Sequence, residues 1–193
     1  MQIAMDAFMI HLDSKVSLIS ELDDIDELVR LYRPRILRYV VYSIKDQDLA
    51  ETITQDCFLK AYNGRASFRG DCAVSTWLMS IANNLIRDQL RTQKFLFWRK
   101  ARTTAVDVHE MASFLPSGES SAETAILARE RLGLVVAALE TLSVNQRAVF
   151  IMKFSEEMDP SEIALATGMP VNTVKTHLHR AVTAIRNKLG SAA

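Results

Sequence analysis

The 193-residue sequence contains little of what metal or redox chemistry needs, with only two cysteines and four histidines. Cys57 and Cys72 do not stand at metal-ligand spacing from each other or from any histidine. His177 and His179 are two residues apart in a predicted helix and therefore face different directions. The sequence shows no recognisable arrangement of a catalytic nucleophile, a general base and a group that orients the base. We expect no metal, no cofactor and no enzymatic activity, and small apolar roles for both cysteines.

Glycine and proline are also scarce, at 6 and 4 residues, whereas 49% of the residues are hydrophobic. Long stretches rich in Leu, Ala, Ile, Glu and Arg favour helices over strands. Apolar runs fall short of the roughly 20 residues that cross a membrane, and the N-terminus carries acids where a secretion signal carries Lys or Arg. The sequence predicts an all-α, cytoplasmic protein that can bury a core.

Neither sign of charge is in excess, because 23 Lys and Arg balance 23 Asp and Glu. The charges are nevertheless segregated along the chain. The first 28 residues hold seven acids against Lys15 alone, whereas residues 87–102 hold six basic residues against Asp88 alone. This segregation indicates an anionic ligand for the basic segments.

The segment 159–189 carries the strongest local pattern. Asp159, Pro160 and Glu162 suit a helix start, and Gly168 suits the left-handed turn that ends a helix. A second helix is expected after this turn, with an apolar stripe opposite a face of amides, hydroxyls and basic groups that includes no acid. Such a helix-turn-helix places its second helix in the major groove of DNA. A helical hairpin with an ordinary solvated face is the alternative.

Two amphipathic stretches come early in the chain. One begins after the capping pair Asp24 and Glu27, and Pro34 is expected to kink it or to split it in two. The next runs from about Asp48 to Tyr62, with one apolar side and one largely acidic side. Both are predicted helices of a first domain.

A third stretch, which ends near Arg91, combines an apolar side with an unusual polar side. Unpaired bases stack on aromatic rings, while amides and guanidinium groups bind the nucleic-acid backbone. This side therefore favours single-stranded nucleic acid. Packing of Trp77 in the core is the competing interpretation. The polar side consists of Trp77, Ser80, Asn83, Asn84, Arg87 and Arg91.

Helical periodicity is lost from Thr92 to Ser121, which predicts a linker between two small domains. Residues 94–100 form a basic and aromatic patch that either docks on a partner or tucks against the preceding helix. After the linker, a capping box at Ser143 predicts a helix that ends near Phe154 and contributes this phenylalanine to the core.

Short motifs in both halves recur in a known order. The first half carries QDCFLKAY (55–62), SFRG (67–70), TWL (76–78) and IANN (81–84). The second half carries LETL (139–142), QR (146–147), EIA (162–164), TVK (173–175) and LHRA (178–181). Over about residues 24–190 the chain resembles the extracytoplasmic-function (ECF) sigma factors of bacterial RNA polymerase.

The resemblance implies a region 2-like domain over residues 24–93, a flexible linker over 94–121 and a region 4-like domain over 122–193, with residues 1–23 outside it. It also implies a promoter-specificity subunit that binds the beta-prime and beta subunits of core RNA polymerase and directs them to promoter DNA. No cofactor or small-molecule substrate is implied. An anti-sigma factor, often membrane-anchored, would control the protein.

The resemblance implies roles for three sets of residues. Core polymerase would bind an acidic helix through Asp48, Glu51, Gln55, Asp56 and Phe58. The melted minus-ten strand would lie on Phe68, Arg69, Trp77, Ser80, Asn83, Asn84, Arg87 and Arg91, with Asn84 facing a flipped-out base. The minus-thirty-five duplex would be read by Asn172, Thr173, Lys175, Thr176, His179 and Arg180.

The second domain departs from the family at some positions. Pro170 and Asn172 stand where family members commonly have small residues, so the base preference does not carry over. Thr176 and His177 replace a common Ser-Arg pair, which removes one phosphate-binding guanidinium. Residues 171–178 are also similar to the LuxR-type DNA-binding helix, which predicts an autonomous regulator that binds duplex without polymerase. That alternative leaves the Trp77 face and the acidic helix unexplained.

Overall fold

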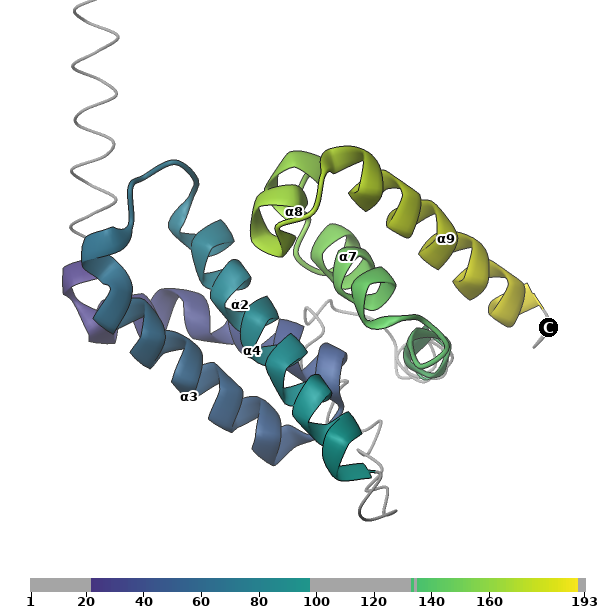
Figure 1. The fold of residues 1–193 in the computed structure, drawn as a ribbon, viewed down its shortest axis with the longest axis horizontal. Helices are drawn as coiled ribbons and strands as arrows, with labels where there is room; N and C mark the ends of the chain where they lie inside the picture. Colours follow the sequence, from purple (N-terminus) through teal and green to yellow (C-terminus); the bar gives the residue numbers. More distant parts are fainter. Residues whose placement is uncertain (1–21, 98–132, 134, 191–193) are drawn as a thin grey trace, which may run out of the picture.

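The computed structural model describes residues 22–97, 133 and 135–190, and within them every regular element is a helix (Figure 1). The first domain contains α2 (Ile25–Ile44), α3 (Gln47–Gly64), the short 3-10 helix η1 (Arg65–Ser67) and α4 (Val74–Phe97). The second contains helical residues 135–139, α7 (Val144–Phe154), α8 (Pro160–Thr167) and α9 (Val171–Gly190). The predicted all-α architecture with two helical domains is confirmed.

Helix α2 begins at the predicted cap. The Asp24 carboxylate accepts hydrogen bonds from the backbone N–H groups of Asp26 and Glu27 at 3.0 and 3.1 Å. Pro34 lies inside α2 without dividing it, so the predicted split is wrong. Pro34 and Arg30, whose carbonyl loses its intrahelical partner, are both exposed, and water can therefore satisfy that carbonyl.

Helices α2, α3 and α4 surround the core of the first domain. Cys57 is fully buried there, with its Sγ 3.4 Å from the Leu78 carbonyl oxygen, and burial raises the pKa of its thiol to about 12. The thiol therefore behaves as a small apolar group, as predicted. The buried core side chains include Leu28, Ile36, Tyr39, Val40, Ile53, Phe58, Ala61, Leu78, Met79, Ala82 and Ile86.

Helix α7 starts with the predicted capping box. The Ser143 backbone N–H donates to Gln146 Oε1 at 3.0 Å, and the Gln146 N–H donates to Ser143 Oγ. The expected core position of Phe154 is wrong, because its side chain is 57% exposed and its ring lies 4.6 Å from that of Phe150. Val149 and Met152 face the core instead.

The predicted helix-turn-helix is confirmed at α8 and α9. Asp159 accepts from the N–H of Ser161 and of Glu162, and Glu162 Oε2 accepts from the Asp159 N–H at 2.8 Å. These backbone hydrogen bonds hold the pKa of the Asp159 carboxyl below its usual value. Gly168 ends α8 at φ 69°, a left-handed conformation that costs little only for glycine.

Some predictions fall at the edge of the described residues or beyond it. Helix α4 continues to Phe97. It therefore extends beyond Thr92, where the helical periodicity of the sequence ends. The side chains of residues 94–100, the rest of the linker and residues 1–21 lie outside the described residues. Within the ranges given above, no helix combines the length and apolarity that crossing a bilayer requires.

The two domains are packed against each other. Helix α8 lies against α4 and α7 lies against α2, whereas α9 covers the other side of α7, facing away from the first domain (Figure 1). Buried apolar residues of both domains belong to one continuous cluster. The contact between the domains places the loop between α7 and α8 on α2. The sequence patterns of the two domains did not predict this contact.

Candidate nucleic-acid interface

Helix α4 presents five of the residues predicted to bind a melted strand along one side. Asn84, Arg87 and Arg91 are exposed, and Trp77 and Ser80 are half-buried. Ser80 Oγ donates to the Trp77 carbonyl oxygen at 2.7 Å, which is a local bond within the helix. The spacing of three and four residues makes these side chains one continuous face.

A hollow of ≈ 580 Å³ lies between α4 and the start of α7. Its lining brings together two amides, two guanidinium groups and one carboxylate, and Arg91 Nη2 lies 3.4 Å from Asp88 Oδ1 at the surface. Amides hydrogen-bond base edges, and guanidinium groups bind phosphates in a fixed fork geometry. We call this the α4 hollow; it is lined by Asn84, Arg87, Asp88, Leu90, Arg91, Val144 and Asn145.

Trp77 is both a packing residue and a partly accessible one. Its ring lies 5.0 Å from the ring of Phe68, tilted by 43°, and it packs against the core cluster. Phe68 is only 8% exposed, which corrects its expected place on the DNA-contacting surface. The Phe68 ring instead packs against the Trp77 ring, while Arg69 in the same loop is exposed.

Asn83 also lies in the interior, which corrects its expected place on the exposed face of α4. Its side chain is 3% exposed, and its Oδ1 accepts a hydrogen bond from the hydroxyl of fully buried Tyr39 at 2.9 Å. Position 83 follows Met79 by four residues and precedes Ile86 by three, and both of these are buried. This spacing was the available sequence signal, because it places Asn83 on the apolar side of the helix.

Asn83→Ala is therefore expected to destabilise the fold by about 1–3 kcal/mol, because it leaves the Tyr39 hydroxyl buried without its acceptor. Equilibrium urea unfolding of the full chain measures this loss. Asn84→Ala is the matched control and should unfold at the wild-type midpoint, since Asn84 is exposed. Equal midpoints for Asn83→Ala and the wild type would contradict a structural role for this amide.

Helix α3 exposes Asp48, Gln55 and Asp56, three of the residues predicted to bind core polymerase. Glu51 is half-buried and accepts a hydrogen bond from Arg33 Nη2 at 2.6 Å. The predicted carboxylates and the Gln55 amide thus share one accessible side of the helix. No cluster of His, Cys, Asp and Glu in the described part of the chain could hold a metal ion.

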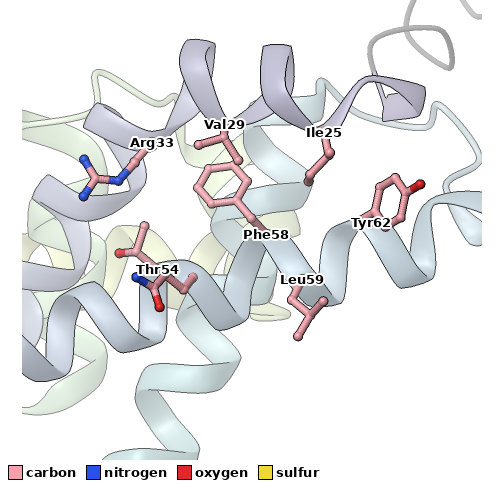
Figure 2. Close-up of a pocket in the computed structure, with 8 residues that line it drawn as sticks. Ile25, Val29, Arg33, Thr54, Phe58, Leu59 and Tyr62 are labelled. Carbon is pink, nitrogen blue, oxygen red and sulfur yellow. The ribbon is translucent and has the colours of Figure 1, made fainter.

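An apolar groove of ≈ 280 Å³ runs beside this acidic side, between α2 and α3 (Figure 2). Phe58 is 4% exposed and lies at the floor of the groove, so its predicted surface position is corrected. Leu59, which sequence reasoning missed, is 58% exposed at the rim. Apolar area next to carboxylates suits a protein partner better than a nucleic acid. The lining is Ile25, Val29, Arg33, Thr54, Gln55, Phe58, Leu59 and Tyr62.

Helix α9 presents the residues predicted to read duplex DNA. Thr173 is half-buried, and its backbone N–H donates to the Pro170 carbonyl at 2.9 Å. The apolar stripe of Val174, Ala181 and Ile185 is buried, so the polar side must face outward. Five predicted residues are exposed on that side, namely Asn172, Lys175, Thr176, His179 and Arg180.

Family models divide the chain as the fold does. Sigma-70 region 2 matches residues 28–95, and sigma-70 region 4 matches residues 132–185. The first match covers the α2, α3 and α4 domain, and the second covers the domain that ends in the helix-turn-helix. The fold and these two regions together define a sigma-70-type sigma factor.

Two relatives resolve the class further. The ECF RNA polymerase sigma factor SigW of Bacillus subtilis (strain 168) is 29% identical over 167 residues, covering 86% of this chain and 89% of the relative. The ECF RNA polymerase sigma-E factor of Escherichia coli (strain K12) is 31% identical over 166 residues, covering 84% of each chain. This chain belongs to the ECF sigma factors of RNA polymerase.

Solved structures share the fold over both domains. The sigma factor RpoE of Bartonella quintana, in complex with the anti-sigma factor NepR, aligns with a TM-score of 0.68 at 21% identity, covering 87% of this chain and 98% of that one. CnrH, in complex with the cytosolic domain of CnrY, aligns with a TM-score of 0.63 at 19% identity, covering 93% and 99%. None of these matches supports the LuxR-type alternative.

Proposed function

We propose that this sigma factor reads a promoter with two chemically different surfaces, one for a melted strand and one for duplex. The observation that carries the proposal is the convergence of Asn84, Arg87 and Arg91 in the α4 hollow, while α9 exposes an acid-free polar face in the other domain. Neither surface includes a catalytic group. The protein is a regulatory DNA-binding subunit, and core polymerase performs the chemistry.

The α4 hollow suits the minus-ten strand. Extruding a base from a duplex costs a few kcal/mol, which hydrogen bonds to its edge and stacking on an aromatic ring can offset. In this proposal Asn84 contacts the base, Arg87 and Arg91 contact phosphates, and the accessible part of Trp77 stacks. Ser80 and Arg69 flank this path.

Helix α9 suits the minus-thirty-five duplex. A major groove about 12 Å wide admits one helix, whose N-terminal residues contact the base edges. Asn172, Thr173 and Thr176 offer hydrogen-bonding groups at that end of α9. Lys175, His179 and Arg180 lie within reach of the phosphates on either side, and the absence of acids on α9 avoids repulsion.

The acidic side of α3 and the neighbouring groove suit core polymerase. Asp48, Gln55 and Asp56 supply polar contacts to the beta-prime subunit, and Leu59 supplies exposed apolar area beside them. An apolar centre with a charged rim is the usual anatomy of a protein interface. Phe58 shapes the floor of the groove between α2 and α3. Glu51 holds the Arg33 side chain, which also lines this groove.

An anti-sigma factor is the second proposed protein partner. Two proteins that share this fold, RpoE and CnrH, have been solved with the anti-sigma factor NepR and with the cytosolic domain of CnrY, respectively. The proposal places this chain in the cytoplasm, held by an anti-sigma factor that is membrane-anchored. The domain division at residues 24–93, 94–121 and 122–193 belongs to the same proposal.

Transcription in vitro from a library of genomic fragments tests the function and requires no promoter to be chosen in advance. Core RNA polymerase with the purified chain is expected to start at a small set of positions that core alone does not use. Sequencing of the 5′ ends then gives both promoter elements. Specific duplex binding by a dimer of the chain, together with no core-dependent starts, would contradict the proposal and favour an autonomous regulator.

A further inference from the structure

The core of the first domain reaches the surface at the apolar groove between α2 and α3. Ile25 and Val29 of α2 are only half-buried there, although both pack against the buried core cluster. Leu59 of α3 is 58% exposed at the rim. Apolar area that is left open in this way usually marks a place where another segment or another protein binds.

The chain enters α2 at one end of this groove. Ile25, the first residue of α2, and Tyr62 line that end, whereas Arg33 lines the other (Figure 2). The two ends are eight residues apart on α2, which is about 12 Å at about 1.5 Å per residue. About eight residues of a helix would therefore span the groove.

Contacts just before α2 fix the point from which the preceding residues start. Leu22 is 1% exposed and belongs to the core cluster. Asp23 Oδ1 lies 3.6 Å from Arg65 Nε, and the Arg65 guanidinium lies 4.0 Å from the centroid of the Tyr62 ring. Since Tyr62 lines the groove, the residues before Leu22 are joined to the domain next to the groove.

Residues 1–20, which we call the N-terminal segment, have an apolar sequence. Twelve of them are hydrophobic, against 49% of the whole chain, and only three are charged. On a wheel of 3.6 residues per turn, one arc about 100° wide holds apolar residues alone. Such spacing is typical of a helix that binds in an apolar groove. The arc consists of Met1, Met5, Phe8, Met9, Leu12, Val16 and Ile19.

The N-terminal segment suits the groove better than a separate partner does. Its charged residues, Asp6, Asp13 and Lys15, all fall outside the apolar arc, so docking of the arc would bury no charge. The three methionines of the arc are flexible side chains that adapt to irregular apolar surfaces. Because the segment is covalently joined at one end of the groove, its effective concentration there is on the order of millimolar. Weak binding would therefore be enough to hold it.

We propose that the N-terminal segment folds back onto the groove between α2 and α3 through its apolar arc and covers Leu59 in the free chain. Core polymerase, the proposed partner of the same surface, must then displace the segment. The segment is thus an internal competitor that lowers the apparent affinity of the chain for polymerase. The competition rests on the proposed function, whereas the docking itself does not.

Photocrosslinking in the full chain tests the docking without polymerase. Benzoylphenylalanine in place of Phe8 is expected to join the N-terminal segment to residues 25–33 or 54–62, and mass spectrometry locates the new bond. The control carries the same group in place of Ile10, on the opposite side of the wheel, and should give about fivefold less of this product. A cross-link to other helices or between two chains, or no cross-link to the groove, would overturn the proposal.

A change in the groove tests the same contact from the other side. Leu59→Asp places a charge at the rim and should lower the yield of the cross-link from position 8 about fivefold. Leu165→Asp on α8 is the matched control, because Leu165 is also 58% exposed but does not line the groove. Its cross-link yield should equal that of the parent. Equal yields from the two variants would contradict docking at the groove.

Affinity for core polymerase separates failure of the docking from failure of the proposed function. Phe8→Asp with Leu12→Asp should bind core about tenfold more tightly than the parent, as expected if the segment is docked in about nine of ten free chains. Ile3→Asp with Ile10→Asp adds the same charge outside the arc and should bind as the parent does. A cross-link to the groove combined with equal core affinities would refute the competition. Absence of core-dependent transcription from every variant would refute the proposed function, and the cross-link would still decide whether the segment docks.

Discussion

Asn84→Ala is expected to slow promoter opening by about 10- to 100-fold, since a well-placed amide contact to a base is worth about 1–3 kcal/mol. Asn84 is exposed in the α4 hollow, so its removal leaves the fold intact. Affinity for core polymerase should not change, because α3 and the neighbouring groove lie elsewhere. Permanganate reactivity of unpaired thymines, followed over time on a promoter fragment, measures the opening rate.

The control for Asn84 is another amide on α4. Gln89→Ala removes a side chain that does not line the hollow, and it should open the promoter at the parental rate. Loss of core binding by Asn84→Ala would mean that the residue supports the fold. An unchanged opening rate would remove Asn84 from the strand-binding surface.

Lys175→Ala combined with Arg180→Ala is expected to weaken binding to a minus-thirty-five duplex by about 10- to 100-fold at moderate salt. Each lost phosphate contact should also lower the slope of log affinity against log salt by about 0.9. Both side chains are exposed on α9, so their removal does not disturb the buried stripe. Fluorescence anisotropy at several salt concentrations measures affinity and slope together.

The matched control removes two positive charges from the other domain. Arg30→Ala with Lys60→Ala changes the net charge equally, at exposed positions on α2 and α3. Duplex affinity and salt slope should stay at parental values. Equal losses in both double variants would indicate a general charge effect and would contradict a specific role for α9.

The sequence predicts local features well because their causes are local. The caps at Asp24, Ser143 and Asp159 depend on side chains within three residues, and the turn at Gly168 depends on one backbone angle. The buried stripe of α9 follows from the period of a helix. These elements formed where the spacing predicts them.

The facing of individual side chains depends on neighbours that the sequence does not reveal. Asn83 turns inward because Tyr39, 44 residues earlier, offers a buried hydroxyl. Phe68 turns inward because Trp77 packs over it, and Phe58 because α2 covers it. Helical spacing gave a signal for Asn83, which lies between buried Met79 and Ile86, but the partner that holds its amide is not visible in the sequence.

The ion pairs of Glu156 with Arg35 and Arg38 were beyond prediction for a related reason. Glu156 and Arg35 are 121 residues apart, and each resembles an ordinary solvated charge in its own segment. Only the docking of one domain on the other makes Glu156 a buried carboxylate. Predicting it requires the relative placement of the domains, which the separate patterns of the two halves do not contain.

A map of where each domain meets the promoter tests whether one chain contacts two promoter elements. An iron chelate attached through Asn84→Cys or Arg180→Cys, in a Cys72→Ser background, cleaves nearby DNA in the complex with core polymerase. Cys57 stays unlabelled because it is buried with a raised thiol pKa. We expect cleavage of the non-template strand at the minus-ten element from position 84 and of the duplex at the minus-thirty-five element from position 180. Cleavage of one shared site from both positions would contradict it.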